Sequence, residues 1–320
     1  MVAAIPRAER GLRVFCSLVC FPLTLIQWLL TQKNKLDVKP PGELINVGTG
    51  QLHLQVTGEG EHTVVLEAGM GGCSLDFSLV QPELSQIAKV ISYDRAGLGW
   101  SDKPLERATC RDYVRDLRQL LKTKDCKPPY LLVGHSYGGM IVRFFAAEYP
   151  EEVEGLLLID AAHESRYLTE EMSDQRKRQI AAHRKQYKLG YLLAPTGILS
   201  LLQKHVGARH LPASMQKTAR VLGYRSNAYS AVYTELLDAE ESALQLRATA
   251  SLREDLPITV LSAGKQDAEW KQGQAKLADV SPAVKQVIAE DSWHSIQIHR
   301  PDIVIAAVKE LITELDNPQQ

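Results

Sequence analysis

The residues best suited to chemistry are those of the segment Gly134–Gly138, which carries a serine, Ser136, at its centre. The apolar run before it, Tyr130–Val133, has the length and bulk of a buried strand. An apolar stretch with helical spacing, Met140–Tyr149, follows the segment and is stopped by Pro150. The pattern predicts a strand, a sharp turn and a helix, with the serine at the apex. The glycines at both ends of the segment would let the strand and helix cross closely, and would leave the hydroxyl exposed at the end of a sheet.

A serine hydroxyl is a poor nucleophile at neutral pH unless a base accepts its proton and a third group orients that base. One histidine and two aspartates could supply these groups, because each follows a strand-like run. His294 comes shortly after Val284–Ala289, and Asp267 comes shortly after Ile258–Ser262. Asp160 directly follows a third run of this kind. Such a set would let the serine attack a carbonyl carbon.

The elements that must position these residues alternate between strand-like and helical runs. This alternation is typical of a mostly parallel sheet with helices on both faces. About eight strands are expected, at Leu44–Val47, Gln51–Gln55, Thr63–Glu67, Val90–Tyr93, Tyr130–Val133, Val153–Ile159, Ile258–Ser262 and Val284–Ala289. The alternation stops between about Glu164 and Asp255, where charged and helix-forming residues dominate. We therefore expect an α/β core over residues 43–163 and 256–320, with a helical cap inserted over residues 164–255.

Residues 1–42 are expected to lie outside this fold, as a hydrophobic helix and a linker. The run Val14–Gln32 carries no charge and is at the lower end of the roughly 17–25 residues that span a bilayer. No small-residue cleavage site follows it, so an uncleaved membrane anchor is expected, with Trp28 at the interface. The arginines before the run favour an extracytoplasmic catalytic domain. The alternatives are a cleaved signal, which would give a secreted protein, and a helix packed on the domain.

Charge and cysteine content narrow the class of protein. The formal net charge is −1 and Lys and Arg are distributed through the chain, so no nucleic-acid partner is expected. The five cysteines form no C-x-x-C pair and have no histidines at zinc spacing. Neither a disulfide framework nor a metal site is therefore expected.

Four motifs give the chain a resemblance to the α/β-hydrolase superfamily, in the branch with a helical cap between the sixth and seventh strands. They are Gly-His-Ser-Tyr-Gly-Gly at 134–139, Tyr-Asp-Arg-Ala-Gly-Leu-Gly-Trp-Ser-Asp at 93–102, Leu-Leu-Leu-Ile-Asp at 156–160, and Trp-His at 293–294 followed by Arg-Pro-Asp at 300–302. In that family the nucleophile, the acid and the base follow one another along the chain, each at the end of its own strand. The resemblance implies Ser136 as nucleophile, Asp267 as acid and His294 as base.

Other residues compete for these roles. Asp160 is the alternative acid, because the end of its strand also faces the site. His299 is the alternative base, but it lies just before the proline that begins the last helix. His135 is expected to point away from the serine, and Asp94 is expected to brace its loop by pairing with Arg95.

The resemblance also implies an oxyanion hole made of two backbone amides. One should be that of Tyr137, directly after the nucleophile. The other should be that of Met70, in the glycine-rich turn after the third strand. Many relatives have His-Gly in that turn, whereas this chain has Ala68-Gly69-Met70.

The function implied is hydrolysis of a carboxylic ester, or of an amide or thioester, through an acyl-enzyme on Ser136 and without metal or cofactor. Relatives that open epoxides or remove halide carry an aspartate at the nucleophile position, and the serine argues against both activities. If the N-terminal run is an anchor, a lipid-like ester is favoured. Alternatives on the same fold are an aminopeptidase, an acyltransferase, a carbon–carbon bond hydrolase, a perhydrolase and a non-catalytic ligand-binding receptor.

Overall fold

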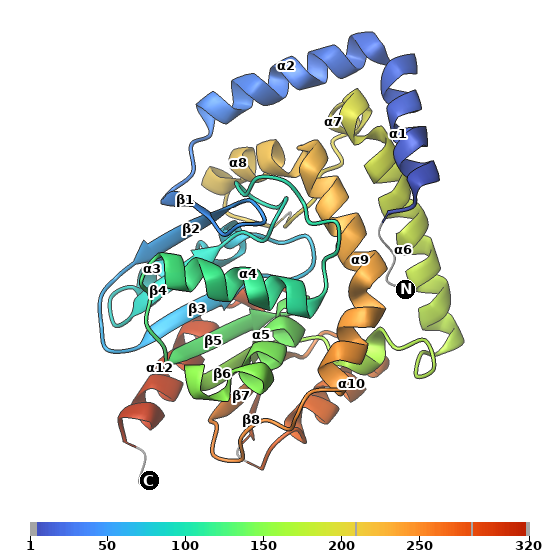
Figure 1. Ribbon diagram of the computed structural model, residues 1–320. Helices are drawn as coiled ribbons and strands as arrows, with labels where there is room; N and C mark the ends of the chain where they lie inside the picture. The colour runs from blue at the N-terminus through green and yellow to red at the C-terminus, as the bar shows by residue number, and fades with distance from the viewer. Residues whose placement is uncertain (1–4, 209, 283, 318–320) are drawn as a thin grey trace.

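The computed structural model describes residues 5–208, 210–282 and 284–317. Eight strands form one sheet in the order β1-β2-β4-β3-β5-β6-β7-β8, and Figure 1 shows helices on both of its faces. The pairs β1–β2 and β2–β4 are antiparallel, and the other five pairs are parallel. This confirms the expected α/β sheet. The strands are β1 (Glu43–Asn46), β2 (Gln51–Thr57), β3 (Thr63–Glu67), β4 (Lys89–Tyr93), β5 (Tyr130–His135), β6 (Val153–Ile159), β7 (Ile258–Ala263) and β8 (Val284–Ala289).

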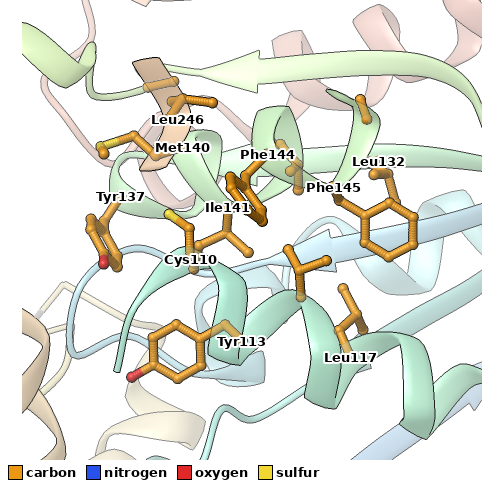
Figure 2. Close-up of a cluster of buried hydrophobic side chains, with 14 of the residues drawn as sticks. Cys110, Tyr113, Leu117, Leu132, Tyr137, Met140, Ile141, Phe144, Phe145 and Leu246 are labelled. Atoms are coloured by element: carbon orange, nitrogen blue, oxygen red, sulfur yellow. The ribbon is translucent and has the colours of Figure 1, made fainter. Parts of the chain in front are cut away.

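The central strands are buried on both faces, as continuous apolar runs in parallel sheets are. On one face Leu132 of β5 packs in a cluster with α4 (Cys110–Thr123) and α5 (Tyr137–Glu148), which Figure 2 shows. On the other face Leu131 and Val133 pack with α12 (Pro301–Asp316). Since neighbouring residues of one strand supply both cores, the carboxyl end of β5 is held firmly between them.

The remaining helices flank these two layers or lie in the insertion between β6 and β7. The insertion contains no strand in its described residues. Its longest helix, α9 (Ser226–Arg247), packs on α4, α5 and α6 (Asp174–Leu193), and so connects the insertion to the core. The further helices are η1 (Ser74–Phe77), α3 (Gln81–Leu84), η2 (Pro150–Glu152), η3 (Glu164–Arg166), α6 (Asp174–Leu193), η4 (Ala194–Thr196), α7 (Ile198–Leu201), α8 (Ala213–Gly223), α9 (Ser226–Arg247), α10 (Ala268–Ala278) and α11 (Ile296–His299).

The N-terminal apolar run forms two helices, α1 (Arg7–Val19) and α2 (Phe21–Asp37), which meet at an angle of 97°. This corrects the expectation of one continuous helix. Pro22 has no N–H to continue the hydrogen-bonding of α1, and its ring clashes with the preceding turn of a continuous helix. Among the described residues no single helix is long and apolar enough to cross a membrane, although the bent pair together meets the same length and composition limits.

These two helices do not stand apart from the fold, because α1 packs along α6 (Figure 1). The Arg13 guanidinium lies 4.3 Å from the ring centre of Tyr191 and donates a hydrogen bond to Ser230 at 2.6 Å. Glu9 lies 2.8 Å from Lys188 and accepts a hydrogen bond from Tyr233. The expectation of a helix outside the fold is therefore corrected for α1, whose polar face is held by the insertion.

Candidate active site

Ser136 lies at the apex of a tight turn between β5 and α5, as the sequence predicts. Its backbone angles, φ 53° and ψ −120°, lie where residues other than glycine are rarely found. The turn has no room for larger neighbours. A Cβ atom at Gly134 would come within 2.7 Å of the Gly138 carbonyl oxygen, and one at Gly138 within 2.5 Å of the Ala68 carbonyl oxygen. Both glycines are thus required for strand, turn and helix to pack with the serine at the surface of a cavity.

Three side chains form a hydrogen-bonded chain from this serine into the interior. His294, in the loop after β8, has its Nε2 atom 2.9 Å from Ser136 Oγ and its Nδ1 atom 2.7 Å from Asp160 Oδ2. A carboxylate only accepts hydrogen bonds, so Nδ1 must carry the proton and Nε2 is left to accept one from the serine. The geometry is that in which a histidine can act as general base towards a serine.

The acid in contact with His294 is Asp160, so the expected pairing of His294 with Asp267 is wrong. Asp267 is the N-cap of α10, and its Oδ1 atom accepts the backbone amide of Trp270 at 2.8 Å. That bond satisfies a helix-terminal amide that has no partner within the helix. Asp160, the alternative acid, occupies the position behind the histidine.

Asp160 is fully buried and held by four donors. Besides His294, its carboxylate accepts hydrogen bonds from Gln266 at 2.6 Å, from the indole of Trp270 at 2.9 Å and from the amide of Ala263 at 3.0 Å. Burial alone would raise the pKa of Asp160, but His294 and these donors outweigh it and lower the pKa below its ordinary value. The carboxylate therefore stays ionised and can stabilise a protonated His294.

The other histidines near the serine have different surroundings. His299, the alternative base, lies 3.2 Å from Ser292 Oγ and stacks on Trp293. The sequence-based expectation that His135 points away from the serine is wrong. Its ring lies 4.7 Å from that of His294 and lines the same cavity. Burial and the neighbouring His294 lower the pKa of His135 to about 3, so it is neutral at physiological pH and adds no charge beside the base.

The turn expected to supply an oxyanion donor lies against the serine. A Cβ atom at Gly69 would come within 3.1 Å of Ser136 Cβ, so only glycine allows the turn to approach this closely. Met70 follows it and lines the cavity beside the serine. Tyr137 is the first residue of α5, where backbone amides lack partners within the helix. The amides of Met70 and Tyr137 therefore belong to two segments that converge on Ser136.

A buried ionic network holds this turn. The guanidinium of Arg95 donates to the carbonyl oxygens of Ala68 and Gly69, each at 2.6 Å, and pairs with Glu67 and Glu235. The expected partner of Arg95, Asp94, instead lies 2.8 Å from His53.

Glu235 belongs to α9, so this network reaches the turn from the insertion. Its Oε1 atom lies 2.8 Å from Arg95, and its Oε2 atom accepts the amide of Gly71 at 2.7 Å. A buried carboxylate with a paired cation and a backbone donor is well satisfied. The helix of the insertion and the turn beside the serine are therefore coupled through one side chain.

The serine opens into a cavity of about 720 Å³ between the sheet and the insertion. Its walls come from the turn after β3, from η3, α6 and α7, and from α9. Most of its lining area is apolar, with Leu199, Leu202, Val232 and Leu236 among the residues that contribute. A cavity of this size and character can hold a small organic molecule with an apolar portion.

The candidate site contains no recognisable metal-binding group. Among the residues that the structure describes, no three His, Cys, Asp or Glu side chains converge as ligands. All five cysteines are free thiols.

Several residues that shape the site could not be recognised from the sequence. Trp270 and Gln266 donate to Asp160, and the Trp270 ring packs edge-on against His294 at 4.9 Å. Gln266 lies in the loop after β7 and Trp270 at the start of α10. These positions would point to a role in the site only if Asp160 were already known to be the acid. Glu235 lies 99 positions after Ser136 in a helix without a motif, so nothing in its local sequence marks it.

The chain matches a known protein family. Residues 62–301 match the family described as alpha/beta hydrolase fold. The curated relatives include the uncharacterized protein YqjL of Bacillus subtilis, 37% identical over 100 residues, which are 31% of this chain and 40% of that protein. An AB hydrolase superfamily protein of Gibberella zeae is 24% identical over 302 residues, 82% of this chain and 91% of that protein. The chain spans less than half the length of three of the curated relatives that it matches: 40% of YqjL, and 19% and 43% of two others.

Solved structures show the same fold at low identity. The epoxide hydrolase CorEH superposes with a TM-score of 0.69 and 18% identity, covering 85% of this chain and 98% of that chain. A thermophilic esterase from Thermogutta terrifontis gives a TM-score of 0.59 and 20% identity, covering 83% and 94%. At these identities the similarity concerns the fold, and the chemistry must be argued from the side chains of this chain.

Proposed function

The chain belongs to the alpha/beta hydrolase fold family, and from that premise we propose that it is a serine hydrolase that cleaves a carboxylic ester. The observation that carries the proposal is His294, which bridges Ser136 at 2.9 Å and Asp160 at 2.7 Å. Structural neighbours include both an esterase and an epoxide hydrolase. A serine in the nucleophile position, hydrogen-bonded to a histidine, supports acyl transfer rather than epoxide opening.

In the proposed reaction, Ser136 Oγ forms a bond to the ester carbonyl carbon while its proton passes to His294 Nε2. The carbonyl oxygen takes the negative charge and accepts hydrogen bonds from the amides of Met70 and Tyr137. The bond to the alcohol oxygen then breaks, and His294 returns the proton to it. Water repeats the sequence on the acyl-enzyme and releases the acid. Asp160 keeps His294 in the required tautomer and stabilises its protonated form.

A panel of p-nitrophenyl esters with acyl chains of graded length tests this proposal. We expect the wild-type protein to release p-nitrophenol with one preferred chain length, because a bounded apolar cavity favours the chain that fills it. Ser136→Ala should lower the rate by at least about 10³ while keeping the melting temperature of the wild type. Folded wild-type protein that turns over no ester, but binds the same compounds reversibly, would favour the ligand-binding receptor instead.

We also propose that the N-terminal helices attach the protein to a lipid surface. Among the side chains that the structure describes, α1 and α2 together expose twelve large apolar ones, far more than scattered surface residues account for. These are Leu12, Val14, Phe15, Leu18, Val19, Phe21, Leu23, Leu25, Ile26, Trp28, Leu29 and Leu30. The helices are too short and too bent to favour a straight span, so we propose that they lie in one leaflet. An extracytoplasmic catalytic domain remains the prediction made from the flanking arginines.

The packing of α2 supports this attachment. A second cavity of about 390 Å³ separates α2 from the body of the protein, with Gln27, Leu30, Trp100 and Leu222 among its walls. Exposed Leu201 and Leu202 at the end of α7 extend the apolar surface towards the catalytic cavity, which Leu202 also lines. A lipid-like ester could therefore reach Ser136 from the surface on which α1 and α2 rest.

A further inference from the structure

One segment of the insertion is strongly basic, although the whole chain carries a formal charge of −1. Residues 175–225 contain no Asp or Glu and eleven basic residues, so the remainder of the chain carries −12. The eleven are Arg176, Lys177, Arg178, Arg184, Lys185, Lys188, Lys204, Arg209, Lys217, Arg220 and Arg225. The even distribution of charge expected from the sequence is therefore misleading. This segment supplies much of the wall of the catalytic cavity.

Arg176 is the unusual member of this group, because it is buried without a carboxylate partner. Three arginines are buried in the described part of the chain. Arg95 pairs with two glutamates, and Arg143 pairs with Glu164 at 2.7 Å. Arg176 is only 5% exposed, yet no ion pair forms to it from any described residue. A buried charge of this kind is costly unless something pairs with it.

The polar contacts of Arg176 are weak. Its Nε atom lies 3.5 Å from the Arg166 carbonyl oxygen, and its Nη1 atom lies 3.4 Å from Gln179 Oε1. Burial and the charge of Arg166 lower the pKa of Arg176, but a guanidinium remains protonated in proteins. The donors of Arg176 are therefore poorly used by the protein itself, and the side chain lines the cavity into which Ser136 opens.

Arg166 is a second cation on the same wall, close to the proposed base. Its guanidinium carbon lies 4.6 Å from the Trp270 ring centre, and that ring lies 4.9 Å from the ring of His294. Because both distances are measured to the Trp270 ring, the Arg166 guanidinium carbon lies at most about 9.5 Å from the centre of the His294 ring. The nearest carboxylate, that of half-exposed Glu269, is 3.8 Å away and offers a screened, incomplete pair.

A third group on this wall responds to the two arginines. His183 of α6 lines the cavity, and burial together with the charges of Arg176 and Arg166 lowers its pKa. Asp76 is an acid that also lines this cavity, and burial raises its pKa to about 7, so it is partly neutral at physiological pH. The cavity therefore has one markedly positive wall.

We propose that Arg166 and Arg176 form a binding site for an anionic group, a carboxylate or a phosphate monoester, at the end of the substrate remote from the scissile ester. Arginine matches both groups with paired N–H donors, and such contacts are strongest in a desolvated site. The inference rests on the proposed esterase activity, since it assigns part of that substrate. It makes the preferred ester an amphiphile, with its apolar portion along the leucines of the cavity and its charge on the arginines.

The test compares two esters that differ in one charge: the mono-p-nitrophenyl ester of suberic acid, and the same compound with its free carboxylate methylated. We expect wild-type kcat/KM to favour the anionic ester. Arg176→Gln should reduce that preference about tenfold to a hundredfold, the range for a charge-assisted hydrogen bond. Arg176→Lys should restore part of it. The quantity compared is the ratio of kcat/KM for the two esters, in which any loss of activity common to both cancels. Arg178→Gln is the matched control, because Arg178 is exposed on the same helix and does not line the cavity.

A binding measurement separates this inference from the proposed function. In the Ser136→Ala protein, suberate or octyl phosphate should raise the melting temperature, and dimethyl suberate should not. Whichever of the two compounds raises the melting temperature more shows whether the site prefers a carboxylate or a phosphate monoester. Arg176→Gln in that background should abolish the rise. A rise that persists in Arg176→Gln, or equal effects of Arg176→Gln and Arg178→Gln, would overturn the anion site. Absence of ester turnover with these shifts intact would overturn the hydrolase and leave the site standing.

Discussion

Asp160 and Asp267 follow the carboxyl ends of neighbouring parallel strands, β6 and β7, yet only Asp160 reaches His294. Asp267 is instead used by the backbone, because α10 begins at the next residue and needs an N-cap. Asp160 has no such role and turns inward with φ 38°, a strained angle that the four donors to its carboxylate stabilise. The carboxylate of Asp267 is therefore occupied by a backbone amide of α10, whereas that of Asp160 is available to His294.

A pair of substitutions tests this difference in role. Asp160→Asn should lower kcat on the preferred ester by about 10⁴, because an amide does not fix the required tautomer of His294. Asp267→Asn should leave kcat within a few-fold, since asparagine caps helices as well as aspartate does. The measurement is steady-state kinetics on both proteins, with melting temperatures as the control for folding. Loss of activity in Asp267→Asn with Asp160→Asn unaffected would return the role to Asp267.

The sequence could predict Ser136 and His294 because their signals are local: a serine between two glycines after a strand, and a histidine in the loop after the last strand. It could not separate Asp160 from Asp267, because both follow strands whose ends meet at the same edge of the sheet. The residues that decide the matter, Trp270 and Gln266, do so through contacts with Asp160 that span more than a hundred positions. The start of a helix directly after Asp267 was the one local signal against it.

Asp76 allows a prediction about pH. It lines the catalytic cavity, and burial, opposed by Arg95 and assisted by Asp94, raises its pKa from 3.8 to about 7. The folded protein therefore binds this proton more tightly than the unfolded chain does. Its stability should fall as pH rises from about 4 to about 7, and the loss should be constant above that range.

Asp76→Asn removes the titrating group and should remove this loss. We expect the variant to gain up to roughly 4 kcal/mol over the wild type at pH 8, and little at pH 4.5. Urea unfolding of both proteins at the two pH values measures the difference. A stability difference that does not change between pH 4.5 and pH 8 would show that Asp76 titrates normally.

At the scale of the elements, α9 both packs on the helices that cover the sheet and holds the turn beside Ser136. It packs on α4 and α5, and through Glu235 it also holds the turn that carries Met70. The strands and the helices α4, α5 and α12 were predictable, because their apolar periodicity reflects the two cores that they fill. The role of α9 was not predictable, because one buried glutamate in a helix carries no periodic signal.

Glu235→Gln should lower kcat with little change in KM, because the turn would lose a charged partner for Arg95 and its amide positions would shift. Complete loss of one oxyanion donor lowers the rate by about 10² to 10³. A donor that is only displaced should therefore lower kcat by about tenfold to a hundredfold. Glu241→Gln is the control, because Glu241 lies six residues further along α9 and accepts a hydrogen bond from Gln245. Equal kinetics in the two variants would mean that α9 covers the site without positioning it.

At the scale of the whole molecule, the apolar surface of α1 and α2 lies beside the basic segment of the insertion, residues 175–225. Helix α1 packs along α6 and α2 packs on η4, so both N-terminal helices lie beside the insertion (Figure 1). Residues of the insertion line the cavity into which Ser136 opens. An apolar surface flanked by Arg7, Arg10 and Lys33 is suited to a membrane that contains anionic lipid. The sequence predicted the apolar character of this segment, and Pro22 marks where a continuous helix must break. The direction of α1 after the break depends on its packing against α6 and could not be foreseen.

Vesicle flotation tests the proposed attachment. The wild type should float with vesicles of phosphatidylcholine containing phosphatidylglycerol, and binding should weaken with salt. The double variant Phe15→Ser, Trp28→Ser should bind at least about tenfold more weakly, because each large apolar side chain contributes about 1.5–3 kcal/mol when buried. Ile288→Ser, which alters an exposed apolar residue on β8, is the control. A protein that ignores vesicles and forms a dimer that the double variant disrupts would assign this surface to a second copy.

Activation of Ser136 by His294 is tested by the intact mass and peptide map of the protein after reaction with an alkyl fluorophosphonate. We predict a single adduct, located on Ser136, formed rapidly in the wild type, absent in Ser136→Ala and greatly slowed in His294→Gln. A folded wild-type protein that forms no adduct, or forms one on another residue, would contradict the account.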